Sequence, residues 1–230
     1  MISARVLFTD GVQDYASEWD VYSICTYAYN QLNKGSASSA LKTLCADLLR
    51  YGSAAQSFKG YRTDTPADGA MSMEHKAHLS DLTALTFADH NELLGDMEKP
   101  VITWAGKSLS LESKVVLKYV INTESYDGDL ERLNLRVSYK NLLGETVHLI
   151  LSDLEEYHPA RQQYAFCLDS LPASELRAVI SAQVYIGDQP ASVTLRYSPD
   201  TYGNNKTGAL GELCKALFAY SDSAKAYFLG

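Results

Sequence analysis

The sequence predicts an α+β protein in which an antiparallel β-sandwich of about seven strands is flanked by an N-terminal helical hairpin and a C-terminal helix. Apolar residues recur at helical spacing over residues 39–59 and 210–227. Between residues 101 and 200 the spacing changes to the two-residue period of strands. The two helical stretches are also similar to each other, so we expect them to be internal repeats.

Each helical stretch places one apolar stripe on one face. In the first copy the steps of three and four residues join Leu41, Leu44, Leu48, Tyr51, Ala55 and Phe58. In the second copy the corresponding residues are Leu210, Leu213, Leu217, Tyr220, Ala224 and Tyr227, and Cys45 corresponds to Cys214. A helix of this length is marginal alone, so we expect the two stripes to pack on each other or on a sheet.

The similarity extends upstream of the helices. Ile2-Ser-Ala-Arg-Val6 matches Ile180-Ser-Ala-Gln-Val184 at an offset of 178, whereas the helices match at an offset of 169. The first copy therefore carries nine more residues between strand and helix. We expect strands 2–8 and 178–186 to occupy related positions, in one sheet or at neighbouring module borders.

The N-terminal part reads as strand 2–8, a helix over about 18–33 and the repeated helix 39–59 with Ser38 or Ser39 as its cap. A short loop joins the helices, so they should pack antiparallel. We divide the chain into residues 1–60, the tail of a preceding repeat; 61–100, an irregular segment that wraps the surface; 101–200, the sandwich; and 201–230, the C-terminal repeated helix.

Alternating strands fill the sandwich region. Leu133, Leu135, Val137 and Tyr139 alternate with polar residues, and further strands are expected around 108–113, 117–121, 147–151, 164–168, 178–186 and 191–197. Short strands with one apolar face and turns between them are typical of immunoglobulin- or fibronectin-like sandwiches.

Three stretches together resemble a known type of module. They are Ser108-Leu-Ser-Leu-Glu-Ser-Lys-Val-Val-Leu-Lys-Tyr119, Leu48-Leu-Arg-Tyr-Gly-Ser-Ala-Ala-Gln-Ser-Phe58 and Gly60-Tyr-Arg-Thr-Asp64. The set looks like a module found repeatedly in large secreted or cell-surface proteins of anaerobic Gram-positive bacteria. Ser221-Asp-Ser-Ala-Lys225 departs from the pattern in the second helix. The resemblance implies an extracellular ancillary role and assigns no site.

Charge, apolar runs and cysteine content limit the classes of partner and site that we expect. A net charge of −8 argues against nucleic acid and anionic membranes as partners. No apolar run approaches the ~20 residues of a spanning helix, and no signal-peptide pattern is found. The four cysteines include no C-x-x-C pair, and Cys45 and Cys214 are expected to be small buried hydrophobes.

Two sets of side chains are candidates for binding. Trp104, Tyr126, Tyr157 and Tyr164 lie in or beside the expected sandwich, where exposed aromatic faces could stack on sugar rings, although core packing is the more ordinary role of such residues. His75, His78 and Asp81 could converge on a metal ion if residues 72–82 were helical, although H-E-x-x-H is absent.

Three functions remain open at this stage. The leading hypothesis is a non-catalytic structural or adhesion module of an extracellular or cell-surface protein, without a cofactor, whose partner is a polysaccharide or another surface protein. The alternative is a carbohydrate-binding module that uses the exposed aromatics. The third is a metal-dependent hydrolase. No G-x-S-x-G, P-loop or G-x-G-x-x-G motif favours an enzyme.

Overall fold

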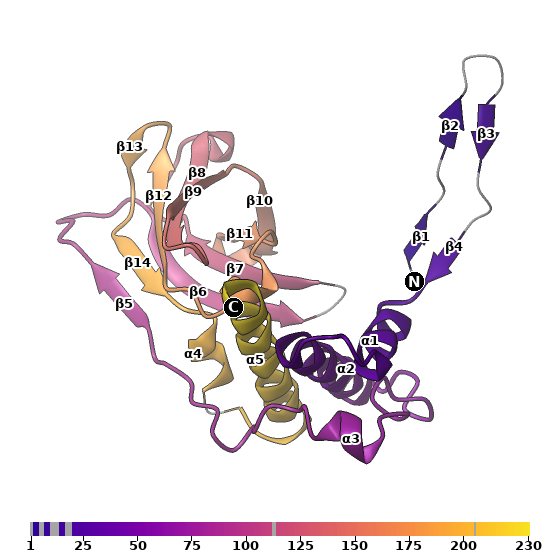
Figure 1. Cartoon of the computed structure of the whole chain (residues 1–230). Helices are drawn as coiled ribbons and strands as arrows, with labels where there is room; N and C mark the ends of the chain where they lie inside the picture. The colour runs from indigo at the N-terminus through magenta and orange to yellow at the C-terminus, as the bar shows by residue number, and fades with distance from the viewer. Residues whose placement is uncertain (1, 5–6, 10–13, 17–19, 112–113, 205) are drawn as a thin grey trace.

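A computed structural model describes residues 2–4, 7–9, 14–16, 20–111, 114–204 and 206–230. Over these residues the protein is α+β, with two antiparallel sheets of ten strands in total and five α-helices (Figure 1). Four further short strands near the N-terminus pair among themselves, apart from both sheets.

The four-stranded sheet has the order β10-β11-β7-β6. Its strands are β6 (Thr103–Leu111), β7 (Val115–Asn122), β10 (Leu154–His158) and β11 (Gln163–Leu168). A bulge between Trp104 and Gly106 shifts the register of β6 against β7.

The six-stranded sheet has the order β5-β14-β12-β8-β9, and β13 pairs with the far end of β12. Its strands are β5 (Asn91–Leu94), β8 (Leu133–Lys140), β9 (Thr146–Leu151), β12 (Ile180–Ile186), β13 (Gln189–Pro190) and β14 (Thr194–Tyr197). Burial alternates along β8 and β12, so each strand gives one face to the interior and one to the outside.

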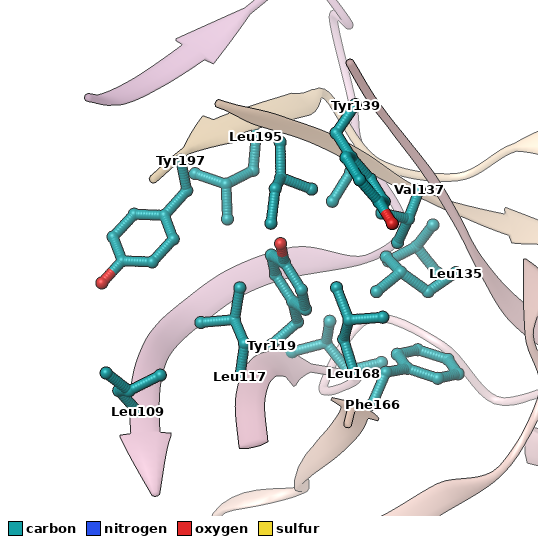
Figure 2. Packing of buried hydrophobic residues seen from close by; sticks show 14 of the residues in the cluster. Leu109, Leu117, Tyr119, Leu135, Val137, Tyr139, Phe166, Leu168, Leu195 and Tyr197 are labelled. Atoms are coloured by element: carbon teal, nitrogen blue, oxygen red, sulfur yellow. The ribbon is translucent and has the colours of Figure 1, made fainter. Parts of the chain in front are cut away.

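The inner faces of the two sheets share one core (Figure 2). Leu117, Tyr119 and Phe166 of the four-stranded sheet lie opposite Leu135, Val137 and Leu195 of the six-stranded sheet. The alternation in the sequence predicted these strands because every second residue had to be apolar to reach this core.

Both repeated sequence stretches form helices, as predicted. Helix α2 spans Ser39–Lys59, with Ser38 accepting a hydrogen bond from the amide of Leu41 as its N-cap. Helix α5 spans Gly208–Leu229 and adds Cys214, Leu217 and Phe218 to the core of the sheets. The two helices pack together (Figure 1), with the rings of Tyr51 and Tyr220 stacked at 6.0 Å.

A second, smaller core lies between α2 and helix α1 (Ile24–Asn33). Its buried residues are Ala28, Leu32, Cys45, Ala46, Leu49 and Met71. The segment after α2 is fastened to it by side-chain hydrogen bonds: Gln56 accepts from the amide of Ala67 at 2.6 Å, and Tyr29 donates to the carbonyl of Ala67 at 2.9 Å. Gly52 allows this close approach, since an added Cβ would lie 3.0 Å from Cβ of Ala67.

The N-terminal strands are β1 (Ile2–Ala4), β2 (Leu7–Thr9), β3 (Asp14–Ala16) and β4 (Asp20–Tyr22). They form two short ladders, β1 with β4 and β2 with β3, that extend away from the helices (Figure 1). The predicted strand 2–8 is thus found as β1 and β2, while residues 5–6 lie outside the described residues. Neither β1 nor β2 lies in the sheet that contains β12, so the expectation that strands 2–8 and 178–186 share one sheet is wrong.

Three other expectations needed correction. The helix predicted over 18–33 starts only at Ile24, because residues 20–22 form β4 and Ser23 caps the helix by accepting from the amide of Cys25. The helix considered over 72–82 is a single turn, α3 (Met73–Lys76). The wrapping segment 61–100 contains β5, which joins the six-stranded sheet beside β14.

Candidate functional site

The outer face of the six-stranded sheet is hollowed, and we call this surface the outer groove. Two adjoining hollows of about 370 and 440 Å³ share Ser138 and Ser181 as lining residues. The first is also lined by Arg136, Val137, His148, Ala182, Gln183, Tyr185 and Thr194. The second is also lined by Tyr139, Lys140, Thr146, Ala178, Val179 and Arg196.

The register of the strands explains why the sheet is hollowed here. Ser181 of β12 lies opposite Ser138 of β8, and these serines are flanked by Arg196 of β14 and His148 of β9. Two small side chains therefore occupy the middle of a row whose ends carry long side chains. Because cross-strand neighbours point to the same face of a sheet, this row forms a trough.

Arg136 and Tyr185 form one wall of the outer groove. The guanidinium of Arg136 lies over the ring of Tyr185, 4.0 Å from its centroid, and its Nη2 pairs with Asp188 at 2.5 Å. The hydroxyl of Tyr185 donates to Oε1 of Gln183 at 3.1 Å, and Nε2 of Gln183 donates to the carbonyl of Ser192 at 2.8 Å. These contacts fix the three polar groups before any ligand arrives.

The outer groove is richer in cationic groups than the protein as a whole. Arg136, Lys140 and Arg196 line it, and none of the described residues that line it is Asp or Glu. The carboxylates that pair with its arginines, Asp188 and Glu92, stand at the rim. On a chain with a net charge of −8, this concentration of cationic side chains favours an anionic ligand at this face.

The four aromatic candidates do not form one exposed platform. Trp104 and Tyr164 both lie opposite Ile121, a fully buried residue, so both rings turn toward the core. The indole Nε1 of Trp104 donates to the carbonyl of Val193 at 3.0 Å.

Tyr126 also packs against the core, and its hydroxyl donates to the carbonyl of Asp129 at 2.9 Å. Tyr157 is exposed on β10, with its ring against His158. Tyr185 lines the outer groove from an outward position, and sequence reasoning missed it. Its signal was an outward position on a strand whose other face is apolar.

The metal candidates do not converge. Both ring nitrogens of His75 are engaged: Nδ1 accepts from the amide of Ser72 at 3.4 Å, and Nε2 lies 3.2 Å from Oδ1 of Asn33. Asp81 is exposed and accepts from the amide and hydroxyl of Thr83. Within the described parts of the chain, no group of three or more His, Cys, Asp or Glu side chains, His78 included, could hold a metal ion.

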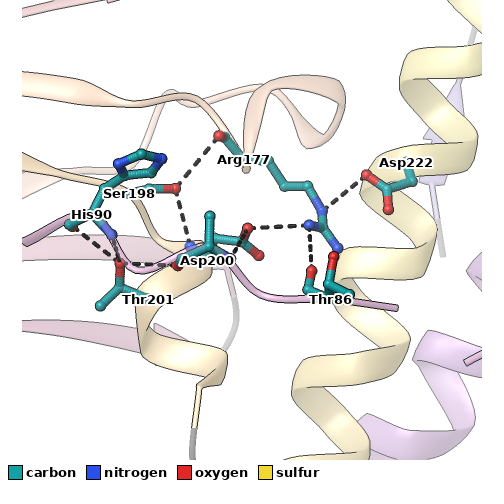
Figure 3. A network of polar contacts seen from close by, with 8 residues as sticks. Thr86, His90, Arg177, Ser198, Asp200, Thr201 and Asp222 are labelled. Carbon is teal, nitrogen blue, oxygen red and sulfur yellow. Dashed lines mark hydrogen bonds and ion pairs between the residues drawn. The ribbon is translucent and has the colours of Figure 1, made fainter. Parts of the chain in front are cut away.

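A cluster of charged side chains surrounds Arg177, of which Asp200 is buried and Asp222 is half exposed (Figure 3). Its guanidinium pairs with Asp200 at 3.1 Å and Asp222 at 2.9 Å, and it donates to the carbonyl of Thr86 at 2.9 Å. Asp200 also accepts from the amide of Ala88. The cluster joins the segment before β5 to α4 (Asp200–Gly203) and α5, which is a structural use of the charges.

Burial dominates the titration of these acids. Desolvation raises the pKa of Asp200, although the amide of Ala88 and the guanidinium of Arg177 act in the opposite direction. Desolvation likewise raises the pKa of Asp222, opposed mainly by Arg177. Pairing with Arg177 and tight packing, at only 2% exposure, give Asp200 a structural rather than a substrate-facing environment.

Cys167 lies on the outer face of the other sheet. Its thiol is 3.2 Å from Oε2 of Glu155, which also pairs with Lys118. Burial, then the neighbouring Glu155, raises the pKa of Cys167 to about 11. A thiol with so high a pKa holds little thiolate near neutral pH, so it is a poor nucleophile. It lies on a different sheet from His148, so the two do not form a Cys–His pair.

Comparison with protein-family models, with curated proteins and with solved structures found no significant match to this chain. No helix among the described residues combines the length and the apolar character needed to cross a bilayer.

Proposed function

We propose that this protein is a non-catalytic adhesion module of an extracellular or cell-surface protein, and that it binds a polysaccharide in the outer groove. The observation that carries the proposal is the trough of hydroxyl and cationic side chains along β14, β12, β8 and β9. Under this proposal Tyr185 takes the place of Trp104, Tyr126, Tyr157 and Tyr164 as the aromatic residue that contacts the sugar.

We further propose that the two sheets are an immunoglobulin-like sandwich. In chain order, β6, β7, β8, β9, β10, β11, β12 and β14 would be strands A, B, C, C′, D, E, F and G. The four-stranded order β6-β7-β11-β10 then reads A-B-E-D, and β14-β12-β8-β9 reads G-F-C-C′. Strand β5 would be an addition beside G. This architecture hosts many functions, so the binding proposal depends on the groove and not on the fold.

The chemistry of the outer groove supports an acidic polysaccharide as the ligand. Arg136 and Arg196, each already paired with one carboxylate of the folded chain, carry guanidinium groups whose geometry suits carboxylates. Ser138, Ser181 and Gln183 provide donors and acceptors that match sugar hydroxyls. An open trough that runs across several strands fits an extended chain better than a compact small molecule.

The roles of the titratable residues support the absence of catalysis. The acids with raised pKa values are paired with Arg177, the thiol of Cys167 has a high pKa, and His75 is engaged as part of a helix cap. Catalytic groups normally face a cavity that admits substrate. A nucleophilic serine needs a neighbouring general base that a third residue holds in position. No hydrogen bond among the described residues gives the serines of the outer groove such a base.

Filling the trough tests the proposal. Ser138→Trp places a large side chain in the middle of the outer groove without entering the core, because Ser138 faces outward. Ser110→Trp is the matched control, since Ser110 lies on the outer face of the four-stranded sheet. A panel of acidic and neutral oligosaccharides is then titrated against each variant.

We expect saturable binding of an acidic oligosaccharide by the wild type and by Ser110→Trp, and loss of at least tenfold in affinity in Ser138→Trp. Equal affinity in both variants would place the ligand elsewhere. If no sugar of the panel binds saturably, and a protein partner binds the wild type but not Ser138→Trp, the ligand of the outer groove is a protein and not a polysaccharide.

A further inference from the structure

The paired strands β1 and β4 are isolated among the described residues. They form a two-stranded sheet, and neither pairs with a strand of the two larger sheets. A lone two-stranded ribbon is at best marginally stable in water, and its open edges can pair with another strand. This ribbon therefore has the form of a segment that is completed by a partner.

The ladder of β1 with β4 matches that of β12 with β14 residue by residue. Ile2-Ser-Ala4 pairs antiparallel with Asp20-Val-Tyr22, so that Ile2 lies opposite Tyr22. Ile180-Ser-Ala182 pairs in the same way with Leu195-Arg-Tyr197, so that Ile180 lies opposite Tyr197. The same tripeptide thus finds a tyrosine at the same register position in both places.

The residue after each tyrosine is a serine whose hydroxyl accepts a hydrogen bond from the amide two residues further on. Ser23 accepts a hydrogen bond from the amide of Cys25 at 3.2 Å, where α1 begins. Ser198 accepts from the amide of Asp200 at 3.3 Å, where α4 begins. The correspondence therefore continues from the strands into the turn that starts the following helix.

The spacing then accounts for the nine extra residues of the first copy. Three lie within the strand pair, since Ile2 and Tyr22 are 20 residues apart whereas Ile180 and Tyr197 are 17 apart. The other six lie between the tyrosine and the repeated helix, where α1 is longer than α4. Both differences lie between the paired positions, whose register is the same in the two places.

We infer that β1 and β4 are the counterparts of β12 and β14 and complete a second sandwich. Strand β12 is bonded on its other side to β8. The open edge of β1 would therefore bind a strand of the β8 kind, and the partner is a set of strands equivalent to β5–β11. The inference rests on the proposed sandwich, and not on the polysaccharide.

An intact second copy of this chain does not fit as the partner. Its β8 edge is already covered by its own β12, and β14 is already flanked by β5. The partner must therefore present the edge of a β8-like strand that no other strand covers. A set of strands that lacks its own F and G strands, and takes β1 and β4 in their place, presents such an edge. One residue fits less well: Asp20 stands at the place of Leu195, which is 1% exposed in the core.

A chimera tests this inference. A copy of residues 87–179 is joined directly to Ile2 of the full chain, because Ile2 corresponds to Ile180. Hydrogen exchange is followed in peptides that cover β1 and β4, with and without the added copy. We expect their amides to exchange at least a hundredfold more slowly in the chimera, and Asp20→Leu to slow them further.

The matched variants of the chimera are Ser3→Pro and Ser3→Thr. Proline removes a ladder donor from what would be a central strand, so it should abolish the protection, whereas threonine should retain it. Unchanged exchange in a soluble chimera would overturn the inference. So would a dimer of the unfused chain that dissociates when residues 2–22 are deleted, because the ribbon would then bind an intact copy.

A transplant decides the case if the chimera is insoluble. Residues 2–22 replace residues 180–197 in the full chain, both with the native Asp20 and with Asp20→Leu. Cooperative unfolding of the Asp20→Leu form supports the correspondence. An unfolded product in both forms contradicts it. Sugar binding is measured separately, so a failure here leaves the proposed ligand unaffected.

Discussion

Asp47 of α2 is fully buried and bonded three times, which makes its removal a sensitive test of how the segment after α2 is held. It accepts from the amide of Ser80 at 3.1 Å and from the hydroxyl of Ser80 at 2.5 Å, and it pairs with Nη2 of Arg50 at 2.6 Å. Asp47→Ala leaves the guanidinium of Arg50, whose side chain is 16% exposed, with the carbonyl of Ser80 as a remaining acceptor.

Removing one partner of a buried ion pair costs about 3–5 kcal/mol. For a chain of this size the shift is roughly 2–4 °C in Tm per kcal/mol, so Asp47→Ala should lower Tm by roughly 6–20 °C. Helix propensity does not add to this loss, since alanine is the best helix former and Ala216 occupies the corresponding position of α5.

The double variant separates an unpaired charge from simple loss of contacts. Asp47→Ala with Arg50→Ala reproduces the pair Ala216 and Ala219 of α5 and removes the orphaned guanidinium. We expect it to be more stable than the sum of the two single losses predicts, by about 1–3 kcal/mol. Thermal and denaturant unfolding measure both quantities. Strict additivity, or a loss below about 1 kcal/mol for Asp47→Ala, would refute the reasoning.

Three further predictions concern the other clusters. Burial raises the pKa of Asp200 above its ordinary value of 3.8, so the contribution of Asp200 to stability is greatest at low pH and is lost as pH rises through the folded-state pKa. Wild type should therefore lose more stability than Asp200→Asn between pH 4 and 8. Equal slopes of unfolding free energy against pH in the two proteins would contradict this. Glu155→Gln should lower the pKa of Cys167 from about 11 and speed its alkylation at pH 9, measured by mass spectrometry; an unchanged rate would show that Glu155 does not control the thiol. Tyr51→Ala and Tyr220→Ala should be coupled by about 0.5–1.5 kcal/mol in a double-mutant cycle of unfolding, and a coupling near zero would argue against a stabilising stack.

Regular elements could be predicted from the sequence because their periodicity is local. The stripe from Leu41 to Phe58 required a helix, and α2 begins at Ser39 behind the Ser38 cap. The alternation from Leu133 to Tyr139 required a strand with one buried face, and β8 has it. In both cases the pattern that buries the side chains is contained in one short stretch.

Elements without such a pattern were missed. Strand β5 is exposed at every residue and is held by backbone pairing with β14, which no side-chain periodicity records. Residues 20–22 continued an apparent helical pattern, but the hydroxyl of Ser23 accepts from the amide of Cys25 and α1 starts only after it.

The candidate site was predicted less well than the fold, because it depends on which strands are neighbours. Ser138 and Ser181 are 43 residues apart in sequence and meet only through the register of β8 with β12. Trp104 was one of the candidates for an exposed aromatic, yet its register opposite Ile121 turns it toward the core. Side-chain direction within a sheet follows from pairing partners, and a single sequence does not provide these.

A thermal-shift panel with acidic and neutral oligosaccharides, with calcium and zinc included, tests the central claim most directly. A ligand present at 100 times its Kd adds about 2.7 kcal/mol to stability, which for this chain is a rise in Tm of roughly 5–11 °C. We expect such a rise with an acidic sugar, and we expect it to be reduced by added salt and absent in Ser138→Trp. A rise in Tm with a metal ion alone would contradict polysaccharide binding in the outer groove. So would the absence of any rise with every sugar of the panel.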